Sequence, residues 1–129
     1  MEVTATVYFK FEKLIVWQKA MDWGEEIFKL SRSFPKHELF NLTSQICRAV
    51  DSVALNIAEG SIDQTNPEQA RFLSYAIRSI SEVVTCLYKA QRRNYITEII
   101  FNDQYKKANE LFRMLISLKN TIRQQTKDH

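Results

Sequence analysis

Two stripes of side chains run along one predicted helix, Arg48-Ala-Val-Asp-Ser-Val-Ala-Leu-Asn-Ile-Ala-Glu-Gly60. One stripe is apolar and repeats at the three- and four-residue steps of a core-facing α-helix. Its members are Ala49, Val50, Val53, Ala54, Ile57 and Ala58. The second stripe keeps the same steps but is polar, and it consists of Gln45, Arg48, Ser52, Asn56 and Glu59. Serine and asparagine are poor helix-interior residues because their side chains compete for backbone hydrogen bonds. Their presence indicates a partly buried hydrogen-bond network or a ligand surface.

The rest of the chain has the composition of a single helical domain. Its 129 residues are 45% hydrophobic and 26% charged, but they include only two glycines and two prolines. Sheet-rich and loop-rich folds need more turn residues, so this composition favours long helices joined by few turns. The net charge of +3 does not by itself demand a nucleic-acid partner.

Apolar periodicity predicts four amphipathic helices in this domain. Their ranges are about 15–32, 38–61, 67–92 and 98–124, and residues 1–13 precede them as an N-terminal arm. The arm is β-branched and aromatic, which is compatible with a short strand, a contact onto a neighbour or a frayed end. The short connections predict an all-α fold, an antiparallel up-down-up-down four-helix bundle.

Punctuating residues set the expected helix ends. Gly60 is predicted to cap the second helix, and Asn66-Pro67-Glu68 to start the third with Asn66 as its cap. Thr97 or Asn102 is predicted to cap the fourth helix.

Several aromatic residues are expected to be structural. The predicted core stripe of the first helix contains Trp17, Ala20, Met21, Gly24, Ile27, Phe28 and Ser31. Phe72 and Phe112 are predicted to belong to the core stripes of the third and fourth helices. Phe34 and Phe40 flank the first turn and are expected to seal that end of the bundle.

Signals for catalysis, cofactors and membranes are missing from the sequence. His37 and His129 lie in a turn and at the C-terminus without the spacing of a metal site, and two glycines can hardly build a phosphate-binding loop. Cys47 and Cys86 are expected to be reduced thiols in apolar surroundings. No signal peptide and no apolar run near the ~20 residues of a membrane span are visible. We therefore expect a soluble, cytoplasmic, non-enzymatic protein with no metal, no cofactor and no small-molecule substrate.

The polar stripe has a counterpart on the third predicted helix. Residues three or four apart there are Arg71, Tyr75, Arg78 and Glu82. An arginine can satisfy a carboxylate such as Glu59 or Glu82 through a bidentate pair, and serine or asparagine can fill the remaining bonds. The favoured interpretation is an inter-helix or inter-subunit network that fixes register; ligand binding and catalysis are the alternatives.

Basic residues concentrate towards the C-terminal part of the chain. The candidate nucleic-acid contacts are Lys89, Arg92, Arg93, Lys106, Lys107, Arg113, Lys119 and Arg123. Residues 106–129 hold only two acids, whereas residues 34–62 hold two basic residues against three acids. The alternative to phosphate binding is a solvated face with cations placed favourably near helix C-termini.

The order and spacing of several motifs resemble a known family. The motifs are Leu14-Ile-Val-Trp-Gln-Lys-Ala20, Phe34-Pro-Lys-His-Glu38, Leu42-Thr-Ser-Gln-Ile-Cys-Arg-Ala49, Asn56-Ile-Ala-Glu-Gly60 and Arg71-Phe-Leu-Ser-Tyr-Ala76, with Ser52, Ser79 and Glu82 between or after them. Together they resemble the four-helix-bundle proteins encoded in intervening sequences of bacterial 23S ribosomal RNA genes. Two positions depart from the family pattern: no basic residue follows Gly60 closely, and Arg78 stands where the usual residue is glycine.

The resemblance implies a homopentameric ring without established enzymatic activity. One branch of the family, the accessory proteins of diversity-generating retroelements, works with RNA and a reverse transcriptase. Two functions follow as expectations: an RNA-binding adaptor that uses its basic surface, or a protein-interaction scaffold without nucleic-acid affinity. A clustering of the basic side chains on one exposed face favours the adaptor, and their dispersal among acids favours the scaffold.

Overall fold

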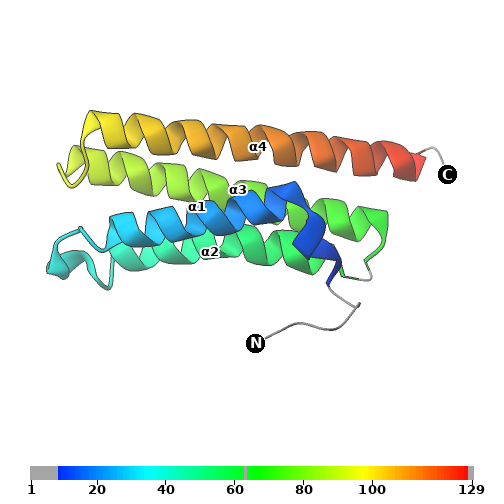
Figure 1. The fold of residues 1–129 in the computed structure, drawn as a ribbon, viewed down its shortest axis with the longest axis horizontal. Helices are drawn as coiled ribbons and strands as arrows, with labels where there is room; N and C mark the ends of the chain where they lie inside the picture. Colours follow the sequence, from blue (N-terminus) through cyan, green and yellow to red (C-terminus); the bar gives the residue numbers. More distant parts are fainter. Residues whose placement is uncertain (1–8, 63, 128–129) are drawn as a thin grey trace.

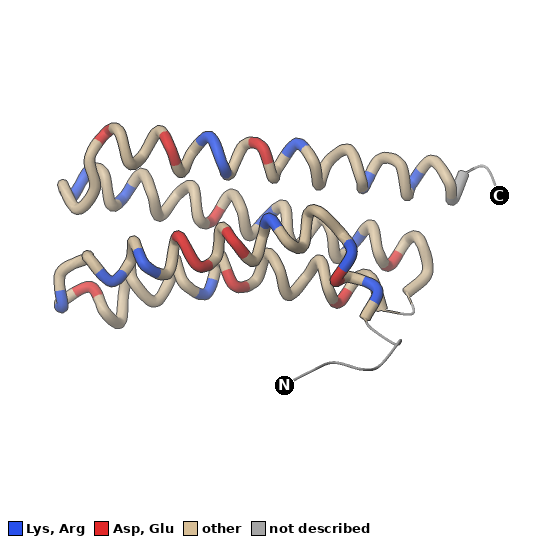
Figure 2. The backbone as a smooth tube through the Cα atoms, in the orientation of Figure 1, with Lys and Arg blue, Asp and Glu red and all other residues tan. Residues whose placement is uncertain are grey.

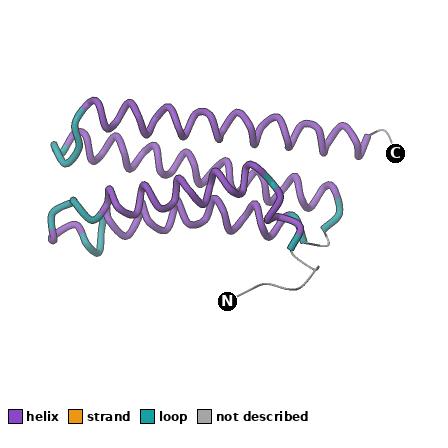
Figure 3. The backbone as a smooth tube through the Cα atoms, viewed as in Figure 1, coloured by secondary structure: helices purple, strands orange, loops and turns teal. Residues whose placement is uncertain are grey.

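The computed structural model describes residues 9–62 and 64–127, and nearly all of them lie in helices or short turns. The elements in chain order are η1 (Lys10–Lys13, a 3-10 helix), α1 (Ile15–Ser31), η2 (Lys36–Glu38, a 3-10 helix), α2 (Leu42–Gly60), α3 (Asn66–Arg92) and α4 (Glu98–Lys127). Within the described ranges there is no strand (Figure 3). The prediction of an all-α fold built on four helices is confirmed.

The helices lie side by side along one long axis (Figure 1). α2 packs against α1 and α3, α3 packs against α4, and a sparser contact between α1 and α4 completes the circuit. The α1–α2 and α3–α4 connections lie at the same end of the molecule, and the α2–α3 connection lies at the other end (Figure 1). We call the first of these the double-turn end; it contains residues 32–41 and 93–97.

The buried face of α1 differs from the predicted one. Val16, Ala20, Trp23, Ile27 and Ser31 are buried, whereas Met21 and Phe28 are 44% and 45% exposed. Trp17 is only partly buried. The register is set instead by Trp23, whose indole N–H donates to Gln104 on α4 at 2.9 Å. Since the partner is on the last helix, the periodicity of α1 alone could not distinguish the two tryptophans.

Of the other phenylalanines that were expected to be structural, only Phe34 is buried. Phe72 and Phe112 are half-buried at the edges of the core rather than inside it. Phe34 is buried at 7% exposure, and its ring centroid lies 5.7 Å from that of Tyr95 in a tilted contact, but Phe40 is 93% exposed. The expectation that both phenylalanines seal the bundle end is therefore wrong for Phe40, which stands just outside α2.

Gly60 serves a purpose other than the predicted left-handed cap. It is the last residue of α2, and neither described glycine has a positive φ. A Cβ placed on Gly60 would lie 2.8 Å from the Cβ of Phe72 on α3, which is closer than real carbon atoms approach. Glycine is thus required here because two helices meet closely, not because the backbone turns.

The N-cap residues of α3 and α4 make side-chain capping bonds, whereas those of α1 and α2, Leu14 and Asn41, make none. α2 begins at Leu42 rather than at residue 38, because residues 36–38 form a 3-10 turn and Glu38 accepts a weak bond from the Leu42 N–H at 3.5 Å. Thr65, not the predicted Asn66, caps α3 by accepting from the Glu68 N–H at 3.4 Å. Of the two caps predicted for α4, Thr97 is the one that forms, since its hydroxyl accepts from the Ile100 N–H at 3.2 Å.

The described part of the N-terminal arm packs on α1. Phe11 lies 4.9 Å from the ring of Trp17, centroid to centroid, and Phe9 stacks on Phe11 at 5.7 Å. Residues 10–13 form the 3-10 helix η1, so the short-strand alternative does not hold for this portion. Residues 1–8, on which the rest of that prediction falls, lie outside the described residues.

Candidate nucleic-acid interface and polar groove

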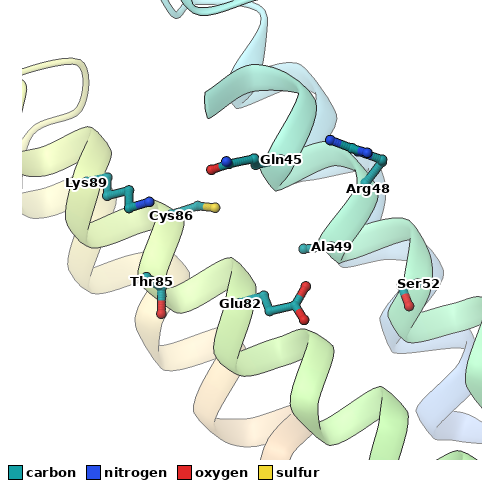
Figure 4. Close-up of a pocket in the computed structure, with 8 residues that line it drawn as sticks. All are labelled: Gln45, Arg48, Ala49, Ser52, Glu82, Thr85, Cys86 and Lys89. Carbon is teal, nitrogen blue, oxygen red and sulfur yellow. The ribbon is translucent and has the colours of Figure 1, made fainter. Parts of the chain in front are cut away.

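A groove between α2 and α3 is lined by part of the predicted polar stripe (Figure 4). Its volume is about 480 Å³, and its lining residues are Gln45, Arg48, Ala49 and Ser52 from α2 and Glu82, Thr85, Cys86 and Lys89 from α3. The carboxylate of Glu82 reaches towards α2 across the groove (Figure 4). Of the two predicted stripes, Gln45, Arg48 and Ser52 of the first and Glu82 of the second thus line one shared groove, whereas the other members lie outside its lining.

The small polar side chains of the stripe form one hydrogen-bonded chain between the two helices. Asn56 Nδ2 donates to the Ser52 hydroxyl and to the Ser52 carbonyl, both at 2.9 Å. The Ser79 hydroxyl on α3 lies 3.0 Å from Ser52 Oγ and 3.0 Å from the Tyr75 carbonyl. Ser79 was noticed only through the family resemblance. These bonds satisfy polar groups that helix packing would otherwise leave partnerless.

The charged members of the network remain separate within this chain. Arg48, Glu59, Arg71, Arg78 and Glu82 are all exposed, and no ion pair joins any of them among the described residues. At exposed positions water competes with ion pairing, so such pairs gain little. Two arginines of α3 lie over aromatic rings: Arg71 is 6.0 Å from the Phe72 ring and Arg78 is 5.6 Å from the Tyr75 ring. An inter-subunit role for these charges stays a prediction.

Cys86 borders the groove but has the properties of a packing residue. It is 5% exposed and carries a free thiol. Burial raises the pKa of this thiol, and the nearby Lys89 only partly offsets that effect. A thiol held in its neutral form is a poor nucleophile, and the groove therefore offers polar and charged contacts rather than an activated group.

Two of the predicted basic contacts are already used inside the bundle. Arg93 Nη1 donates to Glu38 Oε2 at 2.8 Å. Lys107 forms an ion pair with Glu26 on α1 and a second one with Asp103 at 3.4 Å, and the hydrogen bond to Glu26 raises the pKa of the Lys107 ammonium. Arg93 or Lys107 could bind phosphate only if its ion pairs with these acids were broken first.

The remaining basic residues are exposed or half-exposed and have no ion pair among the described residues; they are Lys89, Arg92, Lys106, Arg113, Lys119 and Arg123. Along the first half of α4, acids and bases are interspersed (Figure 2). From residue 111 to residue 125 the sequence contains three basic residues and no acid. Burial and then the like charge of Arg123 lower the pKa of Lys119, which places these two cations close together. We call residues 111–125 the basic half of α4.

A buried hydrogen-bond network around Glu38, at the double-turn end, was not predicted from the sequence. Glu38 is 4% exposed, and its carboxylate accepts from Tyr95 Oη at 2.7 Å, Arg93 Nη1 at 2.8 Å and Asn41 Nδ2 at 3.0 Å. The Tyr95 bond is the main cause that lowers the pKa of Glu38 to about 2, against the opposing effect of burial. His37 Nε2 lies 3.2 Å from the same Tyr95 hydroxyl. The sequence marks Glu38 only as the end of a family motif, and its partners Arg93 and Tyr95 lie more than fifty positions away.

The seam between α1 and α4 is also polar and was likewise missed. Besides the Trp23–Gln104 bond, Lys19 pairs with Glu110 at 3.0 Å and Lys107 pairs with Glu26. Each bond joins residues more than eighty positions apart. Acids and bases of α4 that pair with α1 at this seam are therefore neutralised and contribute less to the electrostatic potential at the surface of α4.

The described residues contain neither a group of three or more potential metal-ligating side chains nor a helix long and apolar enough to cross a membrane.

Comparison with known proteins gives the family. A solved structure from Bacteroides thetaiotaomicron, described as a protein of unknown function from the S23 ribosomal protein family, superposes with a TM-score of 0.76 at 24% identity, over 81% of this chain and 98% of that one. That likeness supports the fold. No curated protein matches the chain. Residues 12–117 match the family model of the 23S rRNA-intervening sequence protein. The chain therefore belongs to the family of 23S rRNA-intervening sequence proteins, as the motifs indicated.

Proposed function

We propose that this protein is a non-enzymatic adaptor: an antiparallel bundle that assembles into a homo-oligomeric ring in the cytoplasm and binds RNA through the basic half of α4. The observation that carries the proposal is the run from residue 111 to residue 125, with Arg113, Lys119 and Arg123 and no acid. None of these three side chains has an ion pair among the described residues. Uncompensated cations at short spacing are the usual source of sequence-independent phosphate binding.

Exposed aliphatic side chains and unpaired charges on the described part of the single chain support assembly of several copies. Ile15, Leu55 and Ile99 are 61%, 67% and 81% exposed, although each is a large aliphatic side chain. The charges that line the α2–α3 groove, Arg48 and Glu82 among them, have no partner in the described chain. Association of copies would bury such apolar side chains and pair such charges. A homopentamer is the assembly that the family resemblance implies, and a ring would multiply the field of each α4.

A protein-interaction scaffold without nucleic-acid affinity is the second candidate. It is favoured by the internal use of Arg93 and Lys107 and by the acids Glu98, Asp103 and Glu110 that interrupt the first half of α4. In this case the basic half of α4 would only maintain solubility.

The deciding experiment is a fluorescence-anisotropy titration of a structured RNA hairpin and a DNA duplex at low and near-physiological salt. The test variant carries Arg113→Gln, Lys119→Gln and Arg123→Gln. The matched control carries Lys10→Gln, Lys13→Gln and Lys29→Gln, which removes the same charge from exposed positions outside α4. Oligomer mass is measured for every protein in parallel.

The adaptor predicts saturable binding that weakens steeply with salt. The negative slope of log affinity against log salt should become less steep by about 2–3 in the α4 variant, at roughly 0.7–0.9 per lost phosphate contact. It should change much less in the control. Absence of binding at low salt by an intact oligomer would leave the scaffold as the function. Equal loss in both variants would show that net charge, rather than α4, is responsible.

A further inference from the structure

A second hollow lies at the double-turn end, between the last turn of α1 and the first turns of α2. Its volume is about 430 Å³, and its lining includes Phe28, Arg32, Phe34, Lys36, Leu39 and Cys47. Phe28 and Leu39 are 45% and 53% exposed although they are large and apolar. The wall is thus mainly hydrocarbon and aromatic surface left open to solvent, which is characteristic of a small-molecule pocket.

Charge around this end pocket has one sign. Arg32 and Lys36 are exposed lining residues, whereas no aspartate or glutamate lines it. Neither cation has an ion pair among the described residues, and Arg32 stacks over the Phe28 ring at 5.5 Å. The nearby acid Glu38 is turned into its own network with Arg93 and Tyr95. The pocket therefore combines an apolar interior with a rim whose positive charge is not neutralised.

Cys47 lines the same pocket and has a defined bonding state. The Ser31 hydroxyl donates to the Phe28 carbonyl at 2.7 Å and lies 3.2 Å from Cys47 Sγ. Because Ser31 has one proton and donates it to Phe28, the Cys47 thiol is the donor in the second contact. The thiol is half-buried and free of any disulfide, so a molecule seated in the pocket would shield it from reagents.

We propose that the end pocket binds an anionic amphiphile, a single hydrocarbon chain that ends in a carboxylate or phosphate. The chain would cover Phe28, Phe34 and Leu39, and the head group would face Arg32 and Lys36. Burial of the chain supplies the affinity, and the one-signed rim selects the charge of the head group. A neutral or cationic amphiphile of equal length lacks the attraction between its head group and the positive rim. This site is separate from the basic half of α4 and does not depend on RNA binding.

The test measures protection of Cys47 from alkylation by N-ethylmaleimide, with peptide mass spectrometry to separate it from the buried Cys86. The probes are sodium decanoate below its micelle concentration, hexanoate as a short-chain control and decyltrimethylammonium as a charge-reversed control. A separate arm uses vesicles of phosphatidylglycerol or phosphatidylcholine, which tells a free amphiphile from a membrane lipid. Lys36→Glu is the test variant, and Lys29→Glu, an exposed residue outside the lining, is its matched control.

The proposal predicts at least a several-fold slowing of Cys47 alkylation by decanoate, and little slowing by hexanoate or decyltrimethylammonium. Protection by phosphatidylglycerol vesicles without protection by decanoate would overturn the single-chain ligand. Lys36→Glu should abolish the protection and Lys29→Glu should retain it. Equal protection by decyltrimethylammonium, or none by any anionic probe, would overturn the proposal. So would a Cys47 that reacts only after denaturation, because the pocket would then be covered in the native protein by another copy of the chain.

Discussion

The hydroxyl of Tyr95 donates a hydrogen bond of 2.7 Å to the carboxylate of Glu38, although 57 positions separate the two residues. This bond joins the connection after α1 to the connection after α3, and Arg93 reinforces it from the end of α3. The double-turn end is thereby held by a buried, fully hydrogen-bonded carboxylate rather than by apolar packing alone.

The first prediction concerns acid stability. The pKa of Glu38 is about 2 in the fold against an ordinary 4.5, so the network stabilises the folded state fully above about pH 4.5. That contribution is lost as the pH falls towards 2, because the unfolded chain then binds the proton more tightly. Glu38→Gln should therefore lower the free energy of unfolding at pH 7, and its deficit should shrink between pH 5 and pH 2. Urea unfolding at several pH values measures this.

A control for this series is Glu110→Gln, which removes an exposed partner of Lys19 at the α1–α4 seam. Exposed pairs contribute only about 0–1 kcal/mol, so the control should stay close to the unmodified protein throughout. Parallel stability curves for Glu38→Gln and the unmodified protein would contradict the assignment.

The second prediction uses the two glycines as a matched pair. Gly60→Ala should destabilise the bundle by about 1–3 kcal/mol, because its new Cβ meets the Phe72 Cβ at 2.8 Å and α3 must shift. Gly24→Ala should stabilise the bundle by about 0.5–1 kcal/mol, since nothing lies within 4 Å of the added methyl group in mid-helix. Thermal and urea unfolding of both variants give the comparison. The same sign of effect in both would refute the explanation from helix approach.

The third prediction addresses the polar bond inside the α1–α4 seam. Gln104→Leu leaves the buried Trp23 N–H without an acceptor and should cost about 1–3 kcal/mol. Trp23→Phe in the Gln104→Leu background should then cost less than Trp23→Phe alone, since the unpaired donor has been removed. A double-mutant cycle by urea unfolding measures the coupling, expected at about 0.5–3 kcal/mol. Strict additivity would mean that the two side chains are independent.

The fourth prediction separates assembly from folding in the α2–α3 groove. Arg48→Ala removes an exposed charge without a described partner, so it should reduce the oligomer mass while leaving the fold of the subunit intact. Asn56→Ala breaks the bonds to Ser52 and should lower subunit stability by about 0.5–1.5 kcal/mol as well. Light scattering after size exclusion, with Lys29→Ala as the control, reports the mass. An unchanged mass for Arg48→Ala at low protein concentration would rule out its role in assembly.

Local pattern was enough to predict the helices, because three-four periodicity is expressed within each of them. It was not enough to orient α1: Trp17 and Trp23 are both apolar residues of one helix, and only Gln104 on α4 distinguishes them. The cap at Thr97 was predictable because its partner, the Ile100 N–H, is three residues away.

The candidate sites show the same dependence on distance along the chain. Ser52 and Asn56 were recognisable because they lie four apart on one helix and are unusual there. The loss of Arg93 and Lys107 to internal ion pairs was not visible, since Glu38 and Glu26 belong to other parts of the chain. Long side chains on a helix surface have several possible partners, and tertiary structure selects one.

The meeting of α1 with α4 also has a consequence for synthesis on the ribosome. Trp23 cannot form its buried hydrogen bond until Gln104 has been translated, 81 residues later. A nascent chain that ends after α3 therefore exposes the indole edge of α1 along with the apolar side chains that α4 will cover. Closure of the bundle must then be one of the last events in the production of the chain.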